Sequence, residues 1–477
     1  MVKIALINPS QNLTKIYGEL SQEAPVLPPL GLCYLASALR EAKLAKVKII
    51  DAQALKISNK KAATKALLWG ADIIGITATT DMIFLASEIA DFVKAKSKKT
   101  KIIVGGPHIS AVPEKTLKMF PSFDIGVINE GEETTKELVS TLEAGKSLKK
   151  VKGIVYREGN KIITTVPREF IQNLDSLLPP AWDLLPHLTK FYKPAIMNYK
   201  NSPSTSIITS RGCPGQCAFC DTRVFGCRYR VHSAKYALDM IRFLKKKYGI
   251  KDIIFYDDQF TIFKERLAQI CEGLQSLGIT WSCQARVNAV DFKTMKMMKD
   301  AGCWKISFGI ESASPKILKL MNKRINLRQA KKAISDAKRA GLEVLGYFII
   351  GFFGETKKTL AMTKKFILNS DLDMIMLSYF LPFPGSPAYP LVNQFGEFHE
   401  DWKNLNAFDP DIPQFIPYGL STKELIAAQK DIYRSFYLRP KIMLRYCQRM
   451  LKNPTEAARF IRTAFNFSKF LFSSNHV

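Results

Sequence analysis

Short apolar runs alternate with longer amphipathic stretches along the first part of the chain. The runs VKIALINP, KVKIIDA, ADIIGITATT, KTKIIVGGPH and FDIGVINEG read as buried strands, and stretches such as LGLCYLASALREA carry apolar residues at helical spacing. Strands that alternate with helices predict a parallel sheet with helices on both faces. In such a sheet, ligands bind beyond the carboxyl ends of the strands, where this chain has small, polar or glycine-rich loops.

A second alternation begins near residue 200, after a hairpin and a linker. GIVYREGNKIITT predicts a hairpin with a Gly159-Asn160 turn, and the proline-punctuated segment LDSLLPPAWDLLP predicts a domain boundary. Six strand candidates follow: STSIITSRGC, KDIIFYDD, ITWSCQAR, WKISFGIES, LEVLGYFIIG and DMIMLSYF. Six strand–helix units fit a partial or full β/α barrel, whose active site lies at the carboxyl ends of its strands.

The last part of the chain has a helical pattern. One predicted helix face carries Arg459, Arg462 and Lys469, and another carries Phe460, Ala464, Phe467 and Leu471. Such a helix either packs on the barrel through its phenylalanines or lies on an anionic membrane surface.

Length and composition set limits on this pattern. A chain of 477 residues is too long for one core, and 47% hydrophobic with 23% charged residues is typical of a globular protein. The N-terminus begins directly as a strand and no apolar run reaches about 18 residues. We therefore expect a cytoplasmic protein without a signal peptide or transmembrane helix. The formal net charge of +28 fits nucleic acid, an anionic membrane surface, acidic small molecules or simply solvated lysines.

Three of the nine cysteines stand together in the segment RGCPGQCAFCDTR, and the other six are scattered. Cys213, Cys217 and Cys220 can converge on one centre from a single loop. A structural zinc ion usually takes four ligands from paired C-x-x-C elements, and the sequence has no second pair. An iron–sulfur cubane held by three cysteines keeps one iron open, and an open metal position is a catalytic feature.

The loop CPGQCAFC, directly after a predicted strand, is similar to the CxxxCxxC motif of the radical S-adenosylmethionine (radical SAM) superfamily. The resemblance implies a [4Fe–4S] cluster on Cys213, Cys217 and Cys220, whose open iron chelates SAM and whose electron cleaves it to a 5′-deoxyadenosyl radical. IIFYDDQFT, CQARVN, FGIES and GYFIIGFFGET resemble further superfamily segments, the last with Phe353 where proline is usual. The resemblance implies SAM contacts from Phe219, Asp257, Asp258, Arg286, Gly309, Glu311, Ser312 and Gly351.

The segments LPPLGLCYLASAL, DIIGITATTD, VGGPHIS and INEGEE, in this order before the barrel, resemble the cobalamin-binding branch of the superfamily. The Asp-x-His-x-x-Gly pattern of mutases, whose histidine ligates cobalt, is absent. We therefore expect base-off cobalamin without a protein histidine ligand. The resemblance implies cobalamin contacts from Pro28, Pro29, Leu30, Gly31, Thr77, Thr79, Gly105, Gly106, Pro107, His108, Glu130, Gly131 and Glu132.

For two of these assignments, the sequence allows a second interpretation. The pair Asp257 and Asp258 either lies near SAM or caps the next helix. His108, in GGPH, either contacts the cofactor or is a polar loop residue with its hydrogen bonds satisfied inside the protein.

Pattern and resemblance together predict an α/β protein. We expect a Rossmann-like cobalamin domain at 1–145, a hairpin and linker at 146–200, a radical SAM β/α barrel at 201–390 and a helical region at 391–477.

The resemblance implies an enzyme that methylates an unactivated carbon of a small molecule or lipid, with a flavodoxin or ferredoxin as electron donor. The alternative is an oxidative cyclisation like that of the anaerobic magnesium-protoporphyrin monomethyl ester cyclase. RNA-modifying methylthiotransferases carry a second cysteine triad in the first domain, where this chain has only Cys33, so no nucleic acid is expected. A non-enzymatic cobalamin carrier would leave the barrel unexplained, and membrane contact through the C-terminal helices is a further expectation.

Overall fold

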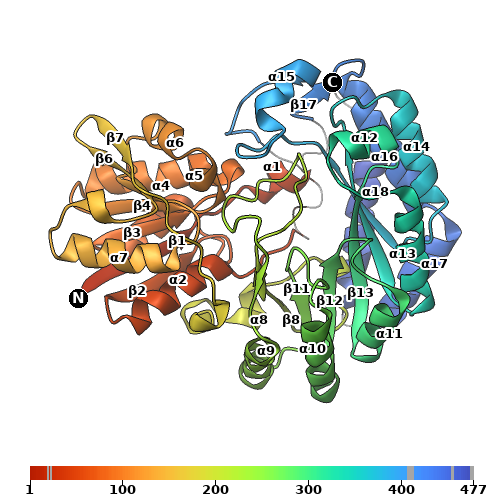
Figure 1. Ribbon diagram of the computed structural model, residues 1–477, viewed down its shortest axis with the longest axis horizontal. Coiled ribbons are helices and arrows are strands. Elements are labelled where there is room, and N and C mark those ends of the chain that lie inside the picture. The colour runs from red at the N-terminus through yellow and green to blue at the C-terminus, as the bar shows by residue number, and fades with distance from the viewer. Residues whose placement is uncertain (19–20, 22–23, 406–412, 453–455, 473–477) are drawn as a thin grey trace.

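The computed structural model describes residues 1–18, 21, 24–405, 413–452 and 456–472. It has two lobes, an N-terminal one around an open, mostly parallel sheet and a C-terminal one around a curved sheet (Figure 1). The N-terminal sheet has the order β2-β1-β3-β4-β5-β6-β7, and its first five strands are parallel. These strands are β2 (Ala45–Asp51), β1 (Val2–Asn8), β3 (Ile73–Thr77), β4 (Lys101–Gly105), β5 (Ile125–Val127), β6 (Ile154–Glu158) and β7 (Lys161–Thr164).

Helices cover both faces of this sheet, as the alternating pattern predicts. One pair, α2 (Leu30–Glu41) and α7 (Glu132–Glu143), packs on one face, and a second pair, α3 (Asn59–Leu68) and α4 (Ile83–Lys96), belongs to a separate hydrophobic cluster on the other. The remaining helices of the lobe are short: α1 (Leu13–Tyr17), α5 (Pro107–Ala111) and α6 (Pro113–Met119).

The predicted hairpin is present, and it belongs to the first lobe. Strands β6 and β7 pair antiparallel across Gly159 and Asn160, and β6 pairs with β5. The N-terminal sheet therefore continues past the boundary expected at residue 145. The reason is that β5 would otherwise be an open edge, which the hairpin covers.

The C-terminal lobe contains the six expected strands in one parallel sheet of order β15-β14-β13-β12-β11-β8. The two outer strands do not pair with each other, so the barrel is a partial one. The strands are β8 (Ser204–Ile207), β11 (Asp252–Phe255), β12 (Thr280–Ala285), β13 (Cys303–Glu311), β14 (Glu343–Ile350) and β15 (Met374–Tyr379). The helices beside them are α8 (Leu188–Phe191), α9 (Ala234–Tyr248), α10 (Lys264–Leu277), α11 (Phe292–Asp300), α12 (Pro315–Leu320), α13 (Leu327–Arg339) and α14 (Lys357–Leu368).

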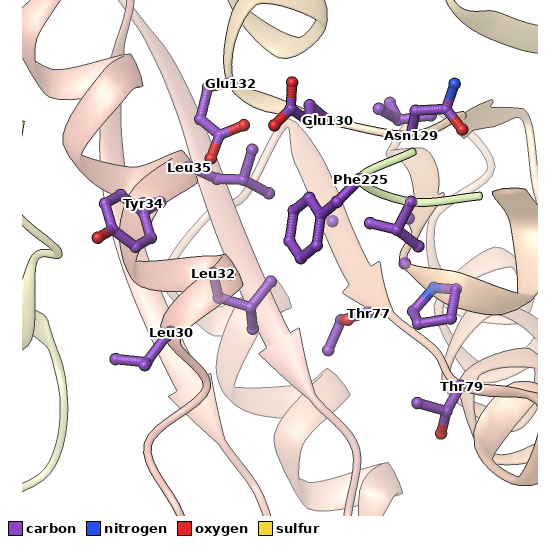
Figure 2. Close-up of a pocket in the computed structure, with 18 of the residues that line it drawn as sticks. Leu30, Leu32, Tyr34, Leu35, Thr77, Thr79, Asn129, Glu130, Glu132 and Phe225 are labelled. Atoms are coloured by element: carbon purple, nitrogen blue, oxygen red, sulfur yellow. The ribbon is translucent and has the colours of Figure 1, made fainter. Parts of the chain in front are cut away.

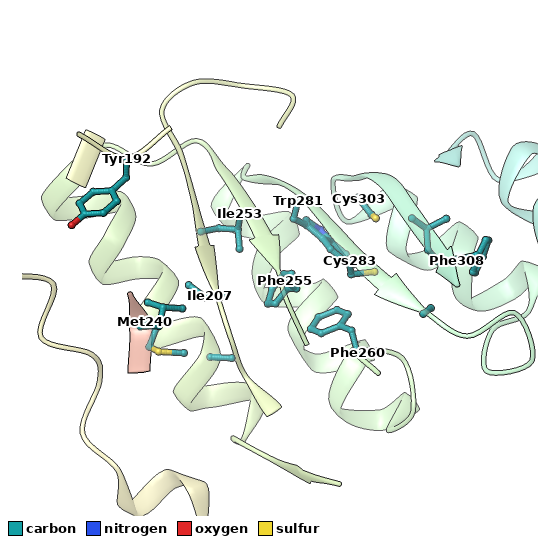
Figure 3. Packing of buried hydrophobic residues seen from close by; sticks show 14 of the residues in the cluster. Tyr192, Ile207, Met240, Ile253, Phe255, Phe260, Trp281, Cys283, Cys303 and Phe308 are labelled. Atoms are coloured by element: carbon teal, nitrogen blue, oxygen red, sulfur yellow. The ribbon is translucent and has the colours of Figure 1, made fainter. Parts of the chain in front are cut away.

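Large aromatic side chains fill the space between the barrel strands and helices (Figure 3). The rings of Phe255, Phe260 and Trp281 lie 4.2 to 5.6 Å apart between centroids, and all three are fully buried. Aromatic pairs at these distances add to the free energy gained from burial alone. This core joins the end of β11, whose last residue is Phe255, to the start of β12, where Trp281 is the second residue.

The C-terminal region is helical after a short sheet of β16 (Gly396–Phe398) and β17 (Phe415–Pro417). Helix α16 (Thr422–Tyr437) covers the open edge of β15. The Tyr433 hydroxyl accepts a hydrogen bond from the Leu377 amide and donates one to its carbonyl, and Tyr437 does the same at Ile375. The remaining elements are α15 (Val392–Phe395), α17 (Pro440–Lys452) and α18 (Ala457–Phe472).

A buried ion-pair network joins the two lobes. Strand β9 (Ser210–Arg211) pairs with β10 (Arg230–Val231), and both arginines reach the loop that follows β5. Arg211 contacts Glu130 at 3.0 Å and Glu132 at 2.5 Å, and Arg230 contacts Glu130 at 3.0 Å. Each of these side chains is at most 6% exposed. The network therefore fixes the cysteine loop, which follows Arg211, relative to the N-terminal sheet.

We predict that Arg211→Met lowers the free energy of unfolding by about 3–5 kcal/mol, because it leaves the buried Glu132 carboxylate without its cation and Glu130 with Arg230 alone. Arg40→Met is the matched control, because the Arg40–Asp183 pair is 40% and 43% exposed and such pairs contribute at most about 1 kcal/mol. Urea denaturation of both variants measures the difference. Equal losses in the two variants would contradict a central role for the network.

Candidate active site

A cavity of about 810 Å³ lies between the two lobes. Its N-terminal wall comes from α2 and from the loops after β3, β4 and β5 (Figure 2). Its other wall comes from the barrel and includes Phe219, Phe225 and Tyr256. We call it the interdomain cavity.

The interdomain cavity extends as an apolar slot between the N-terminal sheet and helices α2 and α7. Leu30, Leu32 and Leu35 of α2 face it (Figure 2). The slot continues along the sheet and α7 and is lined by Ile4, Leu6, Ile73, Gly75, Ile103, Val127, Thr135 and Val139. A slot of this kind fits a long, flat apolar group that enters from the strand ends.

Glycines keep the mouth of the slot open. A Cβ on Gly31 or Gly105 would meet no atom within 4 Å, so each presents bare backbone to the cavity. Gly106 has a φ of 106°, and a Cβ there would lie 2.8 Å from the Ala78 carbonyl oxygen, so no other residue fits without strain. Backbone amides can therefore approach a ligand closely at this edge.

The expected cobalamin residues divide into two groups. The cavity wall contains Leu30, Gly31, Thr77, Thr79, Gly105, Gly106, Pro107, Glu130, Gly131 and Glu132. Pro28, Pro29 and His108 are not part of that wall. The carboxylates of Glu130 and Glu132 also form the buried ion pairs with Arg211 and Arg230 that join the two lobes. Sequence analysis did not predict these ion pairs.

His108 is fully buried beside the interdomain cavity. Its Nδ1 lies 3.2 Å from the Thr80 hydroxyl, and its ring meets that of Trp402 edge to face at 4.5 Å between centroids. Burial, with a smaller effect from Lys115, lowers the pKa of His108 to about 3, so the ring is neutral. The buried Nε2 of His108 has no hydrogen-bond partner within the residues that the structure describes, so the alternative of a loop residue with its hydrogen bonds satisfied is met at Nδ1 alone.

The three cysteines of the loop line a second cavity of about 500 Å³, which we call the cysteine cavity. Tertiary hydrogen bonds hold the loop: the Ala218 amide donates to the Met321 carbonyl, and the Ala388 amide donates to the Ala218 carbonyl. Among the described residues, no three His, Cys, Asp or Glu side chains lie close enough together to hold a single metal ion.

The space between the thiols depends on a glycine. A Cβ on Gly215 would lie 3.3 Å from the sulfur of Cys213 and 3.8 Å from that of Cys217. The hydrogen bond from the Cys220 thiol, and then Lys323 and Arg286, lower the pKa of Cys217 to about 6 despite its burial. Three thiols around an open cradle, with cations beside them, fit an anionic iron–sulfur cluster.

A buried ion pair at the floor of the cysteine cavity was not predicted. Lys323 lies 2.6 Å from Glu311, and both side chains are less than 10% exposed. Arg286 donates a hydrogen bond to the Lys323 carbonyl oxygen and lies 3.9 Å from the Cys217 sulfur. Gly309 is needed beside the pair, since a Cβ there would lie 2.4 Å from the Glu311 carboxylate and 2.8 Å from the Lys323 ammonium.

The two aspartates after β11 have different environments. Asp257 is buried and accepts hydrogen bonds from the amide and hydroxyl of Thr209, so it ties β11 to the start of the cysteine loop. Asp258 lines both cavities, and enclosure by protein together with Asp257 raises the pKa of its carboxyl to about 6. Helix α10 begins after Phe263 without a side-chain cap, so neither aspartate caps it.

Three of the expected SAM residues do not line the cysteine cavity: Asp257, described above, Ser312 and Gly351. The Ser312 hydroxyl is buried and accepts a hydrogen bond from the Ser314 amide, and Gly351, with a φ of 77°, faces Leu425 of α16. Phe353, which stands where proline is usual, stacks on Phe395 at 4.4 Å between centroids. The aromatic cluster around it extends through Phe352 to Phe219 of the cysteine loop.

The two cavities share part of their walls. Phe219, Cys220, Asp221 and Asp258 line both of them. A molecule at this boundary would therefore touch a ligand of the interdomain cavity on one side and a ligand of the cysteine cavity on the other.

Fold and site define an enzyme with a ligand-binding α/β domain set against the three-thiol loop of a β/α half-barrel. The model of the radical SAM superfamily matches residues 207–367, and that of the B12 binding domain matches residues 23–139. An uncharacterized methyltransferase of Pyrococcus horikoshii is 37% identical over 423 residues, which cover 88% of this chain and 89% of the relative. The chain belongs to the cobalamin-binding branch of the radical SAM superfamily, whose cofactors are a [4Fe–4S] cluster, SAM and cobalamin.

Two further likenesses agree. The anaerobic magnesium-protoporphyrin IX monomethyl ester cyclase of Cereibacter sphaeroides is 29% identical over 426 residues, covering 86% of this chain and 67% of the cyclase. The cobalamin-dependent SAM radical enzyme OxsB, with aqua-cobalamin and SAM bound, has the same fold with a TM-score of 0.73. It is 21% identical, and the match covers 97% of this chain and 72% of OxsB.

We predict that Cys217→Ala abolishes cluster assembly, because two thiolates no longer hold the cubane. Iron and sulfide content and visible absorption after anaerobic reconstitution measure this. Cys227→Ala is the matched control: Cys227 is an exposed cysteine seven residues after Cys220, and its loss should leave the iron content unchanged. Loss of the cluster in both variants would contradict the assignment of ligands.

A second prediction concerns Glu355, whose side chain is fully buried and accepts a hydrogen bond from the Thr359 hydroxyl. Burial raises the pKa of Glu355 from 4.5 to about 7. The folded protein therefore keeps a proton that the unfolded chain loses, and its stability falls as pH rises from about 4.5 to about 7. Glu355→Gln should remove this loss. Its free energy of unfolding should therefore exceed that of the wild type by up to about 3 kcal/mol at pH 8, but not at pH 4.5.

Urea denaturation at both pH values tests this prediction. Glu397→Gln, at an exposed carboxylate on β16, serves as the control. A Glu355→Gln gain that is the same at both pH values would show that the titration of Glu355 is not its cause.

Proposed function

We propose that this enzyme methylates an unactivated carbon of a small-molecule substrate. The observation that carries the proposal is the boundary shared by the two cavities, at Phe219, Cys220, Asp221 and Asp258. A substrate carbon held there lies between the B12-binding lobe and the cysteine loop. The relative that is 37% identical, named as a methyltransferase, supports the same reaction class.

The bound cofactors would supply a carbon-centred radical on one side of the substrate and a methyl group on the other. The protein's own residues orient the substrate and exclude water. We assign the exclusion of water to Phe219 and the aromatic cluster behind it. Asp258 is the carboxylate placed to bind a polar group of the substrate or of SAM, and Arg286, Gly309 and Glu311 remain the proposed SAM contacts. The wall residues of the interdomain cavity remain the proposed cobalamin contacts.

The second candidate is a radical oxidative cyclisation, and the 29% identical cyclase is the observation that favours it. Both reactions need an external one-electron donor, for which we propose a flavodoxin or ferredoxin. No helix in the described part of the chain could cross a membrane.

The test is an anaerobic assay of the reconstituted protein with cobalamin, reductant and SAM carrying a deuterated methyl group, against fractionated small-molecule extract. Methylation predicts 5′-deoxyadenosine and S-adenosylhomocysteine in comparable amounts, with the label in a product. Cyclisation predicts 5′-deoxyadenosine without S-adenosylhomocysteine. The Cys217→Ala protein is the background control, and turnover without transfer of the label would overturn the proposal.

A further inference from the structure

The two last helices present apolar side chains to solvent as well as to the barrel. On α18, Phe467 and Phe470 point inward and meet the ring of Tyr433 edge to face. Of the face expected to pack on the barrel, Phe467 makes this contact and Leu471 is buried, whereas Ala464 is exposed. A second set, Ile461, Phe465 and Phe472, is 59%, 59% and 63% exposed.

The exposed set follows one face of α18. Residues 458, 461, 462, 465, 469 and 472 are all exposed, and their spacing of three and four places them along a single side of the helix. The charged members of this side are Arg462 and Lys469, and the Lys469 ammonium lies 4.9 Å from the centre of the Phe465 ring. Helix α17, which packs beside α18, adds Met443, Leu444 and Leu451, all more than half exposed.

The charge of this region is almost entirely positive. Between residues 440 and 472 the only acidic residue is Glu456. The basic residues in that range are Lys441, Arg445, Arg449, Lys452, Arg459, Arg462 and Lys469. On α17, Lys441, Arg445 and Arg449 bind acids of the barrel lobe, as Lys441 does with Asp371. Two cations of α18, Arg459 and Arg462, line a cavity.

This cavity, of about 670 Å³, adjoins the exposed face of α18 through Arg462. It lies between the linker, the loop after β2 and α18, apart from the two cavities of the active site. Lys56, Lys190, Lys193, Arg459 and Arg462 line it, with Glu456 as the one carboxylate among the described lining residues. A phosphate group would meet a strongly positive field there.

We propose that the exposed faces of α17 and α18, with the adjoining basic cavity, dock the enzyme on an anionic lipid bilayer. Exposed leucine, isoleucine and phenylalanine side chains would insert at the acyl boundary, and the cations would bind lipid phosphates. Such a pairing of apolar insertion with positive charge is the requirement for reversible binding of a helix that lies in the membrane plane. The charge complementarity favours an anionic membrane over a second copy of this strongly basic chain.

Vesicle flotation of the full-length reconstituted protein tests the proposal. We expect binding to vesicles of phosphatidylcholine with phosphatidylglycerol, little binding to phosphatidylcholine alone, and release as salt concentration rises. Phe465→Glu combined with Phe472→Glu should lower partitioning about tenfold or more, since each loses apolar insertion and adds repulsion. Arg462→Gln combined with Lys469→Gln should lower it about tenfold, on anionic vesicles only.

Leu68→Glu is the matched control, because Leu68 is 84% exposed on α3 of the other lobe, and its partitioning should equal that of the wild type. Circular dichroism of each variant confirms that it is folded. Equal wild-type binding to neutral vesicles, or none to anionic ones, would overturn the proposal. So would a dimer, measured by light scattering, that dissociates in the Phe465→Glu variant, because a second copy would then cover this face.

Discussion

The site depends most on the buried ion pairs between the Arg211 guanidinium and the carboxylates of Glu130 and Glu132. Burial by itself would lower the pKa of Arg211, but the carboxylates of Glu132 and Glu130 raise it well above its usual value, so the charge persists inside the protein. Tyr34 and Phe225 lie on the guanidinium at 5.3 and 5.2 Å from their ring centroids. A bidentate, planar cation between aromatic faces allows little sliding or rotation. Two residues later the chain reaches Cys213, so this geometry sets the distance between the cluster loop and the N-terminal sheet.

A second buried ion pair helps to position the cysteine loop from the barrel side. Lys323 and Glu311 come from the loop before α13 and from the end of β13. Both Glu311 and the neighbours of Lys323, Asn322 and Arg324, have positive φ angles, which cost free energy in residues other than glycine. The same loop holds the cysteine loop through Gln216, which accepts hydrogen bonds from Asn322 and Arg324. Backbone strain here is thus offset by contacts that position the thiols.

The sequence was sufficient to predict what depends on local pattern. The parallel sheet, the six barrel strands, the hairpin turn and the spacing of the three cysteines all follow from periodicity and short motifs. Partners distant in sequence could not be predicted in this way. Nothing in INEGEE shows that Glu130 will bind arginines 81 and 100 residues away, and nothing in MNKR shows that Lys323 will face Glu311. His108 lies in the predicted segment, but its contact with the ring of Trp402, 294 residues further along the chain, could not be predicted from GGPH.

The open barrel explains why the C-terminal helices have an outer face to use. A closed barrel has no strand edges, whereas this half-barrel leaves the edge of β15 to be covered. Tyr433 and Tyr437 of α16 satisfy that edge, and the inward phenylalanines of α18 pack on the same tyrosines. Helix α16 therefore covers the β15 edge, and the inner side of α18 packs on α16. Apolar residues on the outer side add nothing to this packing, so selection for the fold alone gives no reason for their presence.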